Sequence, residues 1–267
     1  MKPSYTLLDI PRSRIATFDT AAVALTKHHV SAMLEFDVTE IKRRLQQLRR
    51  TGTIISFNGW LIKVIGNVLD QHREAAAFLL SKRKLIVFDE ISISIIVEKK
   101  VNGKPVPIPL LIEHVHSKSA AEITAEIDKA KDQSITGNDI VLNRKTSFYE
   151  NLYYNLPGFL RRMIWRVMLK NPRFVFRNMG NAIITSVGMM GKINGWFIQR
   201  SIHPISFGVG SILKKPSVID NEIKIRDILN MTILVDHDVI DGAPMVRFLN
   251  ELTRSIESGD CIEKLTP

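Results

Sequence analysis

The segment VDHDVIDG, residues 235–242, says more about this chain than any other stretch of its 267 residues. The apolar run 228–235 predicts a strand, His237 follows that strand, and Asp241-Gly242 opens a predicted helix. A histidine held at a strand end, with a carboxylate one turn away, suits a general base because its ordinary pKa lies near neutral pH. These eight residues therefore predict both a strand-to-helix junction and a reactive site.

The pattern on either side of this junction predicts an α+β fold. Helix 241–257 is amphipathic, and residues 99–109, which are rich in Gly and Pro, predict a turn into an extended segment. The strands and helices show no regular βαβ alternation, which favours a mixed or antiparallel sheet. The inward face of helix 241–257 is expected to carry Met245, Val246, Leu249, Leu252 and Ile256. The other predicted strands are 31–38, 91–97, 181–187 and 205–213, and the other predicted helices are 39–50, 57–69 and 119–131.

Composition places the chain among globular proteins. It is 45% apolar and 24% charged, it has no apolar run of signal-peptide or membrane-span length, and its single cysteine, Cys261, excludes an intrachain disulfide framework. We therefore expect a cytoplasmic location. The net charge of +10 is concentrated, because residues 144–177 hold eight basic residues and one acidic residue. The remainder is nearly neutral, so nucleic-acid binding is not expected.

Around His237 the chain resembles the catalytic domain of the acyltransferase component of 2-oxo acid dehydrogenase complexes, which shares the fold of chloramphenicol acetyltransferase. His237, Asp241 and Gly242 match the family's His-x-x-x-Asp-Gly hallmark. Residues 183–191 resemble the family strand whose hydroxyl residue stabilises the tetrahedral intermediate, and Thr185 falls at that position, 52 residues before His237. Shorter matches extend the resemblance over nearly the whole chain, at residues 12–16, 36–39, 56–57 with Lys63, 103–107 and 208–210.

The resemblance implies a chloramphenicol acetyltransferase-like two-layer sandwich, with a mixed β-sheet flanked by helices. His237 would act as the general base, and the Thr185 hydroxyl would donate to the oxyanion, with Ser186 as the fallback donor. A plainer interpretation stays open for Thr185, which could simply be a residue that favours strands.

Asp241 would orient this site, by the same resemblance, through an arginine from the N-terminal region. Arg12 is the matching candidate, and Arg14 is the second. A simpler role stays open here too, because Asp is a good N-cap and Asp241 stands where the last helix begins.

The chain would then be a CoA-dependent acyltransferase. It would move an acyl group between a CoA thioester and a thiol, hydroxyl or amine acceptor, as a homotrimer with active sites between subunits. The acceptor would be a separate lipoylated protein or a small molecule. We expect no lipoyl or peripheral-subunit-binding domain in this chain. Residues 126–130 match the sequence of a lipoylation turn, but they lie in a helical pattern, so we expect no lipoyl attachment there. No metal site is predicted. The alternative is a non-catalytic scaffold or membrane-surface binding protein on the same fold.

One departure from the family lies beside the histidine. Asp238 stands where the family commonly has a basic residue. A carboxylate close to His237 would raise the pKa of the imidazole and repel an anionic acceptor.

The second departure is an insertion at about 138–178 in what we expect to be a single catalytic domain, 1–267. Asn155 and Pro157 predict the start of a helix, and Asn171-Pro172 its end. Three interpretations stay open: packing on the domain, peripheral membrane contact through 156–173, and docking to a protein. The helix could also form a wall of an amphiphilic acceptor's site, and its charge could attract the phosphates of CoA. One stripe is apolar (Phe159, Leu160, Met163, Ile164, Val167, Met168) and another is basic (Arg162, Arg166, Lys170, Arg173).

Overall fold

A six-stranded mixed sheet forms the centre of the molecule, with the strand order β1-β8-β7-β6-β4-β5. The computed structural model describes residues 3–8, 10, 13–101, 104–132, 153–188 and 191–262. Strand β6 pairs in parallel with β4 and β7, and the remaining neighbours pair antiparallel. The strands are β1 (His29–Asp37), β4 (Ile93–Val101), β5 (Lys104–Ile112), β6 (Ala182–Ser186), β7 (Ile205–Ile219) and β8 (Glu222–Asp236), and a separate hairpin joins β2 (Phe78–Ser81) to β3 (Lys84–Ile86).

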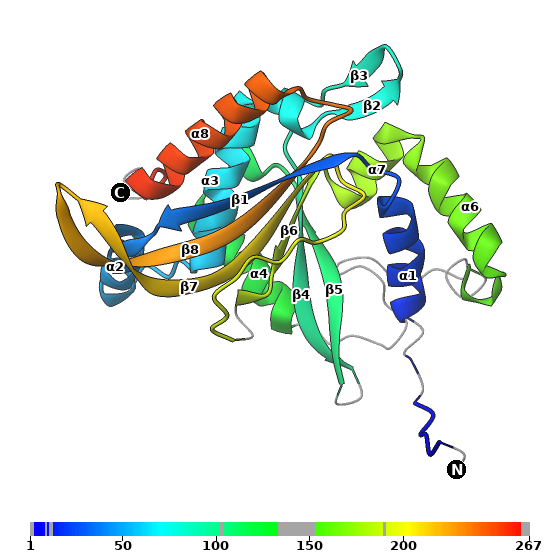
Figure 1. The fold of residues 1–267 in the computed structure, drawn as a ribbon, viewed down its shortest axis with the longest axis horizontal. Helices are drawn as coiled ribbons and strands as arrows, with labels where there is room; N and C mark the ends of the chain where they lie inside the picture. The colour runs from blue at the N-terminus through cyan, green and yellow to red at the C-terminus, as the bar shows by residue number, and fades with distance from the viewer. Residues whose placement is uncertain are drawn as a thin grey trace.

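Four helices cover one face of this sheet (Figure 1). Ser56 begins the central one, α3, because its Oγ accepts a hydrogen bond from Gly59 N at 3.0 Å. Trp60 and Ile65 of α3 are fully buried against the sheet and the neighbouring helices. The two-layer α+β fold is therefore confirmed. The four helices are α2 (Thr39–Arg50), α3 (Phe57–Gln71), α4 (Ala120–Asp132) and α8 (Gly242–Ser258), and the short 3-10 helices are η1 (Arg73–Ala76) and η2 (Val115–Ser117).

Three further helices lie at the other end of the molecule: α1 (Ser13–Ala24), α6 (Gly158–Leu169) and α7 (Pro172–Met179). Helices α1 and α6 run side by side (Figure 1). A buried carboxylate joins them, because Asp19 of α1 accepts hydrogen bonds from Tyr153 Oη and Arg161 Nε, both at 2.7 Å. Trp165 Nε1 donates to Tyr153 Oη at 2.8 Å. Burial, together with the bond to Asp19, raises the pKa of Tyr153, so its hydroxyl stays a donor.

The predicted helix in the insertion is confirmed, but its apolar stripe divides between two faces. Leu160, Ile164 and Met168 are half-buried, whereas Phe159 is 64% exposed and Val167 63% exposed. Packing on the domain therefore accounts for only half of the stripe. Asn171 also begins a second helix, α7, by accepting a hydrogen bond from Phe174 N at 3.3 Å. Residues 138–152 of the predicted insertion lie outside the described residues.

The prediction that Val246 faces inward is wrong. Val246 is 51% exposed, and Phe248 takes its place in the core with no exposed surface. The reason is helical geometry, since two residues span about 200° around the axis, so a face centred near Phe248 and Leu252 turns Val246 outward. Within the described residues, no helix is long and apolar enough to cross a membrane.

Strands β7 and β8 extend well beyond the predicted 205–213 and 228–235. They continue as a hairpin to Ile219 and Glu222 and project from the body of the sheet (Figure 1). Asp220 and Asn221 form the two-residue turn, with φ of 53° and 63°. Positive φ at both central residues is typical of the tight hairpin turns that asparagine and aspartate tolerate.

Candidate active site

The turn that carries His237 is fixed by its backbone. His237 N donates to His28 O at 3.0 Å, at the point where β1 begins. Val239 N and Ile240 N donate to Asp236 O at 3.0 and 3.3 Å. His237 directly follows the end of β8, the position that the sequence predicted, and its side chain is exposed.

An ion pair between Lys27 and the buried carboxylate of Asp236 stabilises this turn. The Asp236 side chain is 1% exposed, and its Oδ2 lies 2.7 Å from Lys27 Nζ. Its Oδ1 accepts a hydrogen bond from Asp238 N at 3.2 Å. Because a buried carboxylate is costly without its partners, Lys27 holds the residue directly before His237 in place.

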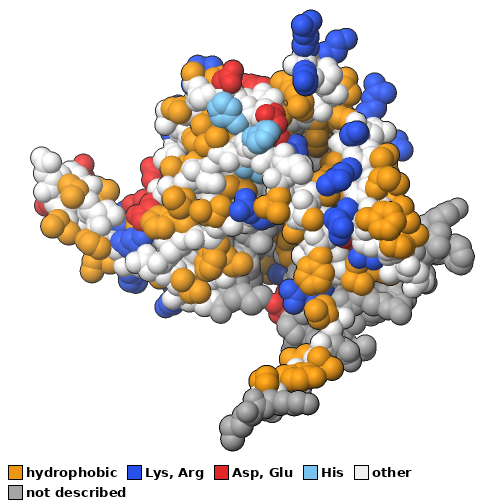
Figure 2. All heavy atoms as spheres, turned by 45° about the vertical axis from the view of Figure 1, so that its right-hand side comes forward, with side chains coloured by type: hydrophobic (Ala, Val, Ile, Leu, Met, Phe, Trp, Pro, Cys, Tyr) orange, Lys and Arg blue, Asp and Glu red, His pale blue; other side chains and the backbone are white. Residues whose placement is uncertain are grey.

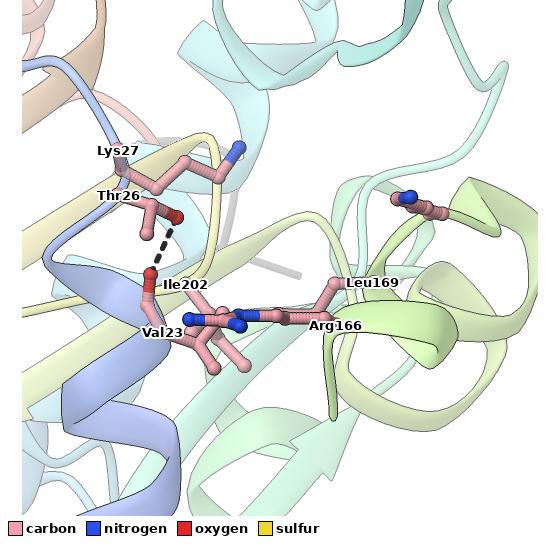
Figure 3. A pocket seen from close by; sticks show the side chains of 7 residues that line it. Val23, Thr26, Lys27, Arg166, Leu169 and Ile202 are labelled. Carbon is pink, nitrogen blue, oxygen red and sulfur yellow. Dashed lines mark hydrogen bonds between the residues drawn. The ribbon is translucent and has the colours of Figure 1, made fainter. Parts of the chain in front are cut away.

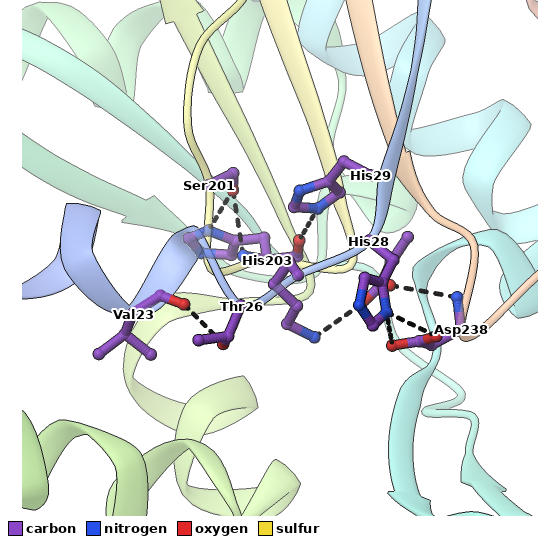
Figure 4. Close-up of polar contacts among 9 residues, drawn as sticks. Val23, Thr26, His28, His29, Ser201, His203 and Asp238 are labelled. Atoms are coloured by element: carbon purple, nitrogen blue, oxygen red, sulfur yellow. Dashed lines mark hydrogen bonds and ion pairs between the residues drawn. The ribbon is translucent and has the colours of Figure 1, made fainter.

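Asp238 is paired with His28. The His28 Nδ1 lies 2.9 Å from Asp238 Oδ2, and both side chains are well exposed (Figure 4). The sequence indicated that Asp238, if close to His237, would raise the pKa of the imidazole and repel an anionic acceptor. The carboxylate is instead in contact with the exposed His28 ring at the start of β1.

Two further histidines hold the segment in front of β7, and the sequence analysis missed both. His203 is buried, and its Nε2 donates to Met179 O at 3.0 Å. The ring of His29 donates from Nε2 to His203 O at 3.0 Å (Figure 4). Burial lowers the pKa of His203 to about 4 and also lowers that of His29. Both rings are therefore neutral at pH 7, and each fixes the backbone through a hydrogen bond to a carbonyl oxygen. For His29 the available signal was the run Thr26-Lys27-His28-His29, which leads into β1, whereas nothing in the sequence pointed to His203.

Thr185 lies in β6 on the sheet face opposite the helices. Ala182 and Ile184 of the same strand are buried in the core, and side chains alternate between faces, so Thr185 points away from that core. The neighbouring position on β7 is Gly208, and a Cβ there would meet Gln199 Oε1 at 2.3 Å. A larger residue at that point would require the Gln199 carboxamide to move, because this carboxamide covers the strand.

Thr185 and His237 of one chain lie far apart. Thr185 pairs with Gly208, and Gly208 pairs with Thr232 of β8, five residues before His237. With about 3.3 Å per residue along a strand and about 4.8 Å between strands, their Cα atoms are roughly 20 Å apart. The fold does not bring these two predicted site residues together within a chain.

Asp241 stands at the N-cap of α8 without capping it through its side chain. Its backbone oxygen accepts a hydrogen bond from Met245 N at 3.1 Å. The predicted partner Arg12 lies outside the described residues. The second candidate, Arg14, is exposed and lies over the ring of Phe18, 5.5 Å from its centroid, in α1. Within the described part of the chain, the Asp241 carboxylate is thus not paired with Arg14.

A family model described as 2-oxoacid dehydrogenases acyltransferase (catalytic domain) matches residues 4–140 and 178–263. The chain belongs to this family. The acyltransferase domain is 26% identical over 242 residues to the lipoamide acyltransferase component of the branched-chain alpha-keto acid dehydrogenase complex of Bacillus subtilis, a match that covers 87% of this chain. The chain spans about half of that relative, 47% of its length.

Solved structures share the fold of this acyltransferase domain. A probable dihydrolipoamide acetyltransferase from Listeria monocytogenes superposes with a TM-score of 0.69 at 20% identity, over 98% of each chain. The dihydrolipoamide acetyltransferase of Azotobacter vinelandii superposes with a TM-score of 0.70 at 17% identity, over 98% of this chain and 95% of that one. The latter was investigated for the role of a serine, a histidine and an asparagine in its catalytic mechanism.

The family match skips residues 141–177. This gap lies within the predicted insertion at 138–178, and it contains all of α6 and most of α7. The α6–α7 pair therefore lies mostly in a segment that the family model does not match.

Proposed function

We propose that this chain catalyses CoA-dependent acyl transfer, with His237 as general base and Thr185 as oxyanion donor. The acceptor's thiol, hydroxyl or amine would lose its proton to the imidazole as it attacks the thioester carbonyl. The tetrahedral oxyanion would take a hydrogen bond from the Thr185 hydroxyl, which contributes roughly 3 kcal/mol to the transition state. Collapse of the intermediate would expel CoA as a thiolate, which recovers the proton from the imidazolium.

One observation carries this proposal. The serine, histidine and asparagine investigated in the Azotobacter enzyme follow one another at the same intervals as Thr185, His237 and Asp241 do here. Threonine keeps the hydroxyl donor, and aspartate keeps an oxygen acceptor in place of the amide. The His237 and Asp241 side chains are both exposed, so a second chain can reach them.

We further propose a homotrimer whose sites form between subunits. The base must lie about 3 Å from the attacking group, and the oxyanion donor must lie about 3 Å from the carbonyl oxygen that is attacked. The roughly 20 Å between His237 and Thr185 forbids this arrangement within a chain. A neighbouring copy would bring its Thr185 to the His237 of the first. The acceptor would be a separate lipoylated protein or a small molecule.

The direct test is His237→Ala, assayed with acetyl-CoA and dihydrolipoamide. Turnover should be lost while the oligomer, measured by light scattering, stays intact. Acetyl-CoA should still raise the melting temperature of the variant, because a ligand at a hundred times its Kd adds about 2.7 kcal/mol to the free energy of unfolding. Retained turnover would contradict the mechanism, and a wild type that no CoA compound stabilises would favour the non-catalytic scaffold.

A second function, peripheral membrane contact through 156–173, has one observation in its favour. The outer face of α6 alternates exposed apolar side chains, Phe159, Met163 and Val167, with the cation Arg162. Residues 153–179 contain six basic residues and no acidic one. Figure 2 shows Lys and Arg side chains interspersed with hydrophobic ones over the right-hand part of the surface. Such a face suits the anionic interface of a bilayer.

Vesicle sedimentation tests this contact. The wild type should pellet with vesicles containing phosphatidylserine and stay in solution with pure phosphatidylcholine. Each cation near an anionic leaflet is worth about 1 kcal/mol, so Arg162→Gln with Arg166→Gln should weaken the partition at least tenfold. Equal pelleting of the double variant would remove the membrane role.

A further inference from the structure

A cleft lies between the inserted helix α6 and the C-terminal end of α1 (Figure 3). Its volume is about 360 Å³, which is many times that of one water molecule and within the range of small-ligand sites. Val23 and Ile202, both 6% exposed, form part of an apolar floor together with Leu169. The insertion supplies one wall, and the segment before β1 supplies the other.

Three cations surround that apolar floor. Lys27 comes from the α1 side, and Arg166 and Lys170 come from α6. In Figure 3 the Arg166 side chain reaches from α6 toward Val23 and Ile202. None of the described residues that line the cleft carries a carboxylate. Lys27 is partly neutralised by Asp236, whereas Arg166 and Lys170 form no ion pair with a carboxylate of the described residues.

This concentration of charge calls for a counter-charge. Two cations that line one cleft repel each other, and an anion bound between them would offset the repulsion. A guanidinium and an ammonium that line the same cleft can both give charge-assisted hydrogen bonds to the oxygens of a phosphate or carboxylate. The apolar floor below them suits the alkyl part of the same ligand.

The cleft also lies next to the proposed general base. Lys27 precedes His28, whose carbonyl oxygen accepts the hydrogen bond from His237 N. One Cα–Cα step along the chain and one hydrogen-bonded step across to His237 place Lys27 and His237 roughly 9 Å apart. A ligand whose anionic group sits in the cleft would therefore hold its other groups within reach of the His237 turn.

We propose that the cleft between α1 and α6 is an anion subsite for an amphiphilic ligand of the acyl-transfer reaction. It takes a phosphate or carboxylate attached to an apolar or flexible arm. This inference rests on the proposed function and extends it, because it makes the inserted helix a substrate-selecting wall. Two ligands could supply the anion: an acyl acceptor with an alkyl chain, or CoA through its phosphates.

The test is calorimetric titration of the full chain at fixed ionic strength with octyl phosphate, inorganic phosphate, octanol and CoA. The test variant is Arg166→Gln with Lys170→Gln. Its matched control is Arg162→Gln with Arg173→Gln, which removes the same charge from the same insertion but lies outside the cleft. Melting curves of both variants show that the fold is retained.

Octyl phosphate should bind the wild type more tightly than phosphate or octanol alone, because it engages the cations and the apolar floor together. The test variant should lose tenfold or more of that affinity, the usual effect of removing a charged hydrogen-bond donor, and the control less than twofold. If CoA rather than octyl phosphate loses affinity in the test variant, CoA supplies the anion. The subsite would be overturned if the test variant and the control variant lost equal affinity, or if neither octyl phosphate nor CoA bound the wild type.

The experiments distinguish a failure of the proposed acyl-transfer mechanism from a failure of the proposed anion subsite. His237→Ala should bind octyl phosphate as the wild type does, since His237 does not line the cleft. Loss of turnover in His237→Ala with unchanged titrations in the test variant would leave the acyltransferase mechanism standing and remove the subsite alone.

Discussion

Two inactive variants of this protein, His237→Ala and Thr185→Ala, should restore activity to each other when they assemble together. The sheet register separates the two side chains by roughly 20 Å within a chain, so a complete site has to take one residue from each of two copies. A copy of His237→Ala still carries an intact Thr185, and a copy of Thr185→Ala still carries an intact His237. A mixed ring therefore contains junctions at which both residues are intact.

The size of the effect follows from ring geometry. In a closed trimer, each site joins the His237 of one copy to the Thr185 of the next, so any trimer that contains both variants holds about one complete site in three. Random assembly from equal amounts, with pure trimers included, gives about a quarter of the wild-type activity. Thr185→Ala alone should retain about a hundredth of the activity or less, as expected for the loss of one oxyanion donor.

The assay is co-expression with two different affinity tags, purification through both, and turnover of acetyl-CoA with dihydrolipoamide. Native mass spectrometry confirms that both variants are present in each trimer. Activity no higher than that of the separate variants would refute the intersubunit site. Replacing Thr185→Ala by Ser186→Ala is the control, because Ser186 points to the other face and its loss should leave the unmixed enzyme active.

Two further predictions concern the supports of the His237 turn. Lys27→Met leaves the 1%-exposed Asp236 carboxylate without its partner, so the free energy of unfolding measured in urea should fall by about 3 kcal/mol, and adding Asp236→Asn should recover much of it; an unchanged stability would show that the pair is not buried in solution. Burial lowers the pKa of His203 to about 4 from an unfolded value near 6.5, so its contribution to stability is complete above pH 6.5 and is lost as the pH falls toward 4. The loss amounts to about 3 kcal/mol, and His203→Asn should reduce the pH dependence by that amount in urea unfolding across the same range.

Much of the fold followed from short-range patterns in the sequence. Helix 39–50 agrees with α2 at both ends, and 57–69 agrees with α3 at its start, because apolar spacing and caps are local signals. The β7–β8 arm was underpredicted because residues 214–217 are polar residues and proline without an apolar alternation, and because no residue of 214–227 is buried. The Asp220-Asn221 turn was the signal that would have extended both strands.

The candidate site was predictable only in part. The motif around His237 lies in one stretch of sequence, so it was found, whereas its supports come from segments far along the chain. Lys27 is 209 residues from Asp236, and His203 is 174 residues from His29. Lys27 and Asp236 form an ion pair, and the neutral His29 ring donates a hydrogen bond to His203, only because the fold brings them together in its interior. Sequence periodicity does not predict contacts between residues so far apart along the chain.

The buried Asp19 has a consequence for how this chain diverged from relatives that lack the insertion. Its partners Tyr153 and Arg161 both belong to the inserted segment. A chain without that segment would lack these two donors to the Asp19 carboxylate, so we expect position 19 and the insertion to have changed together. A comparison of homologous sequences should therefore show an aspartate at position 19 where the extra helices are present and another residue where they are absent.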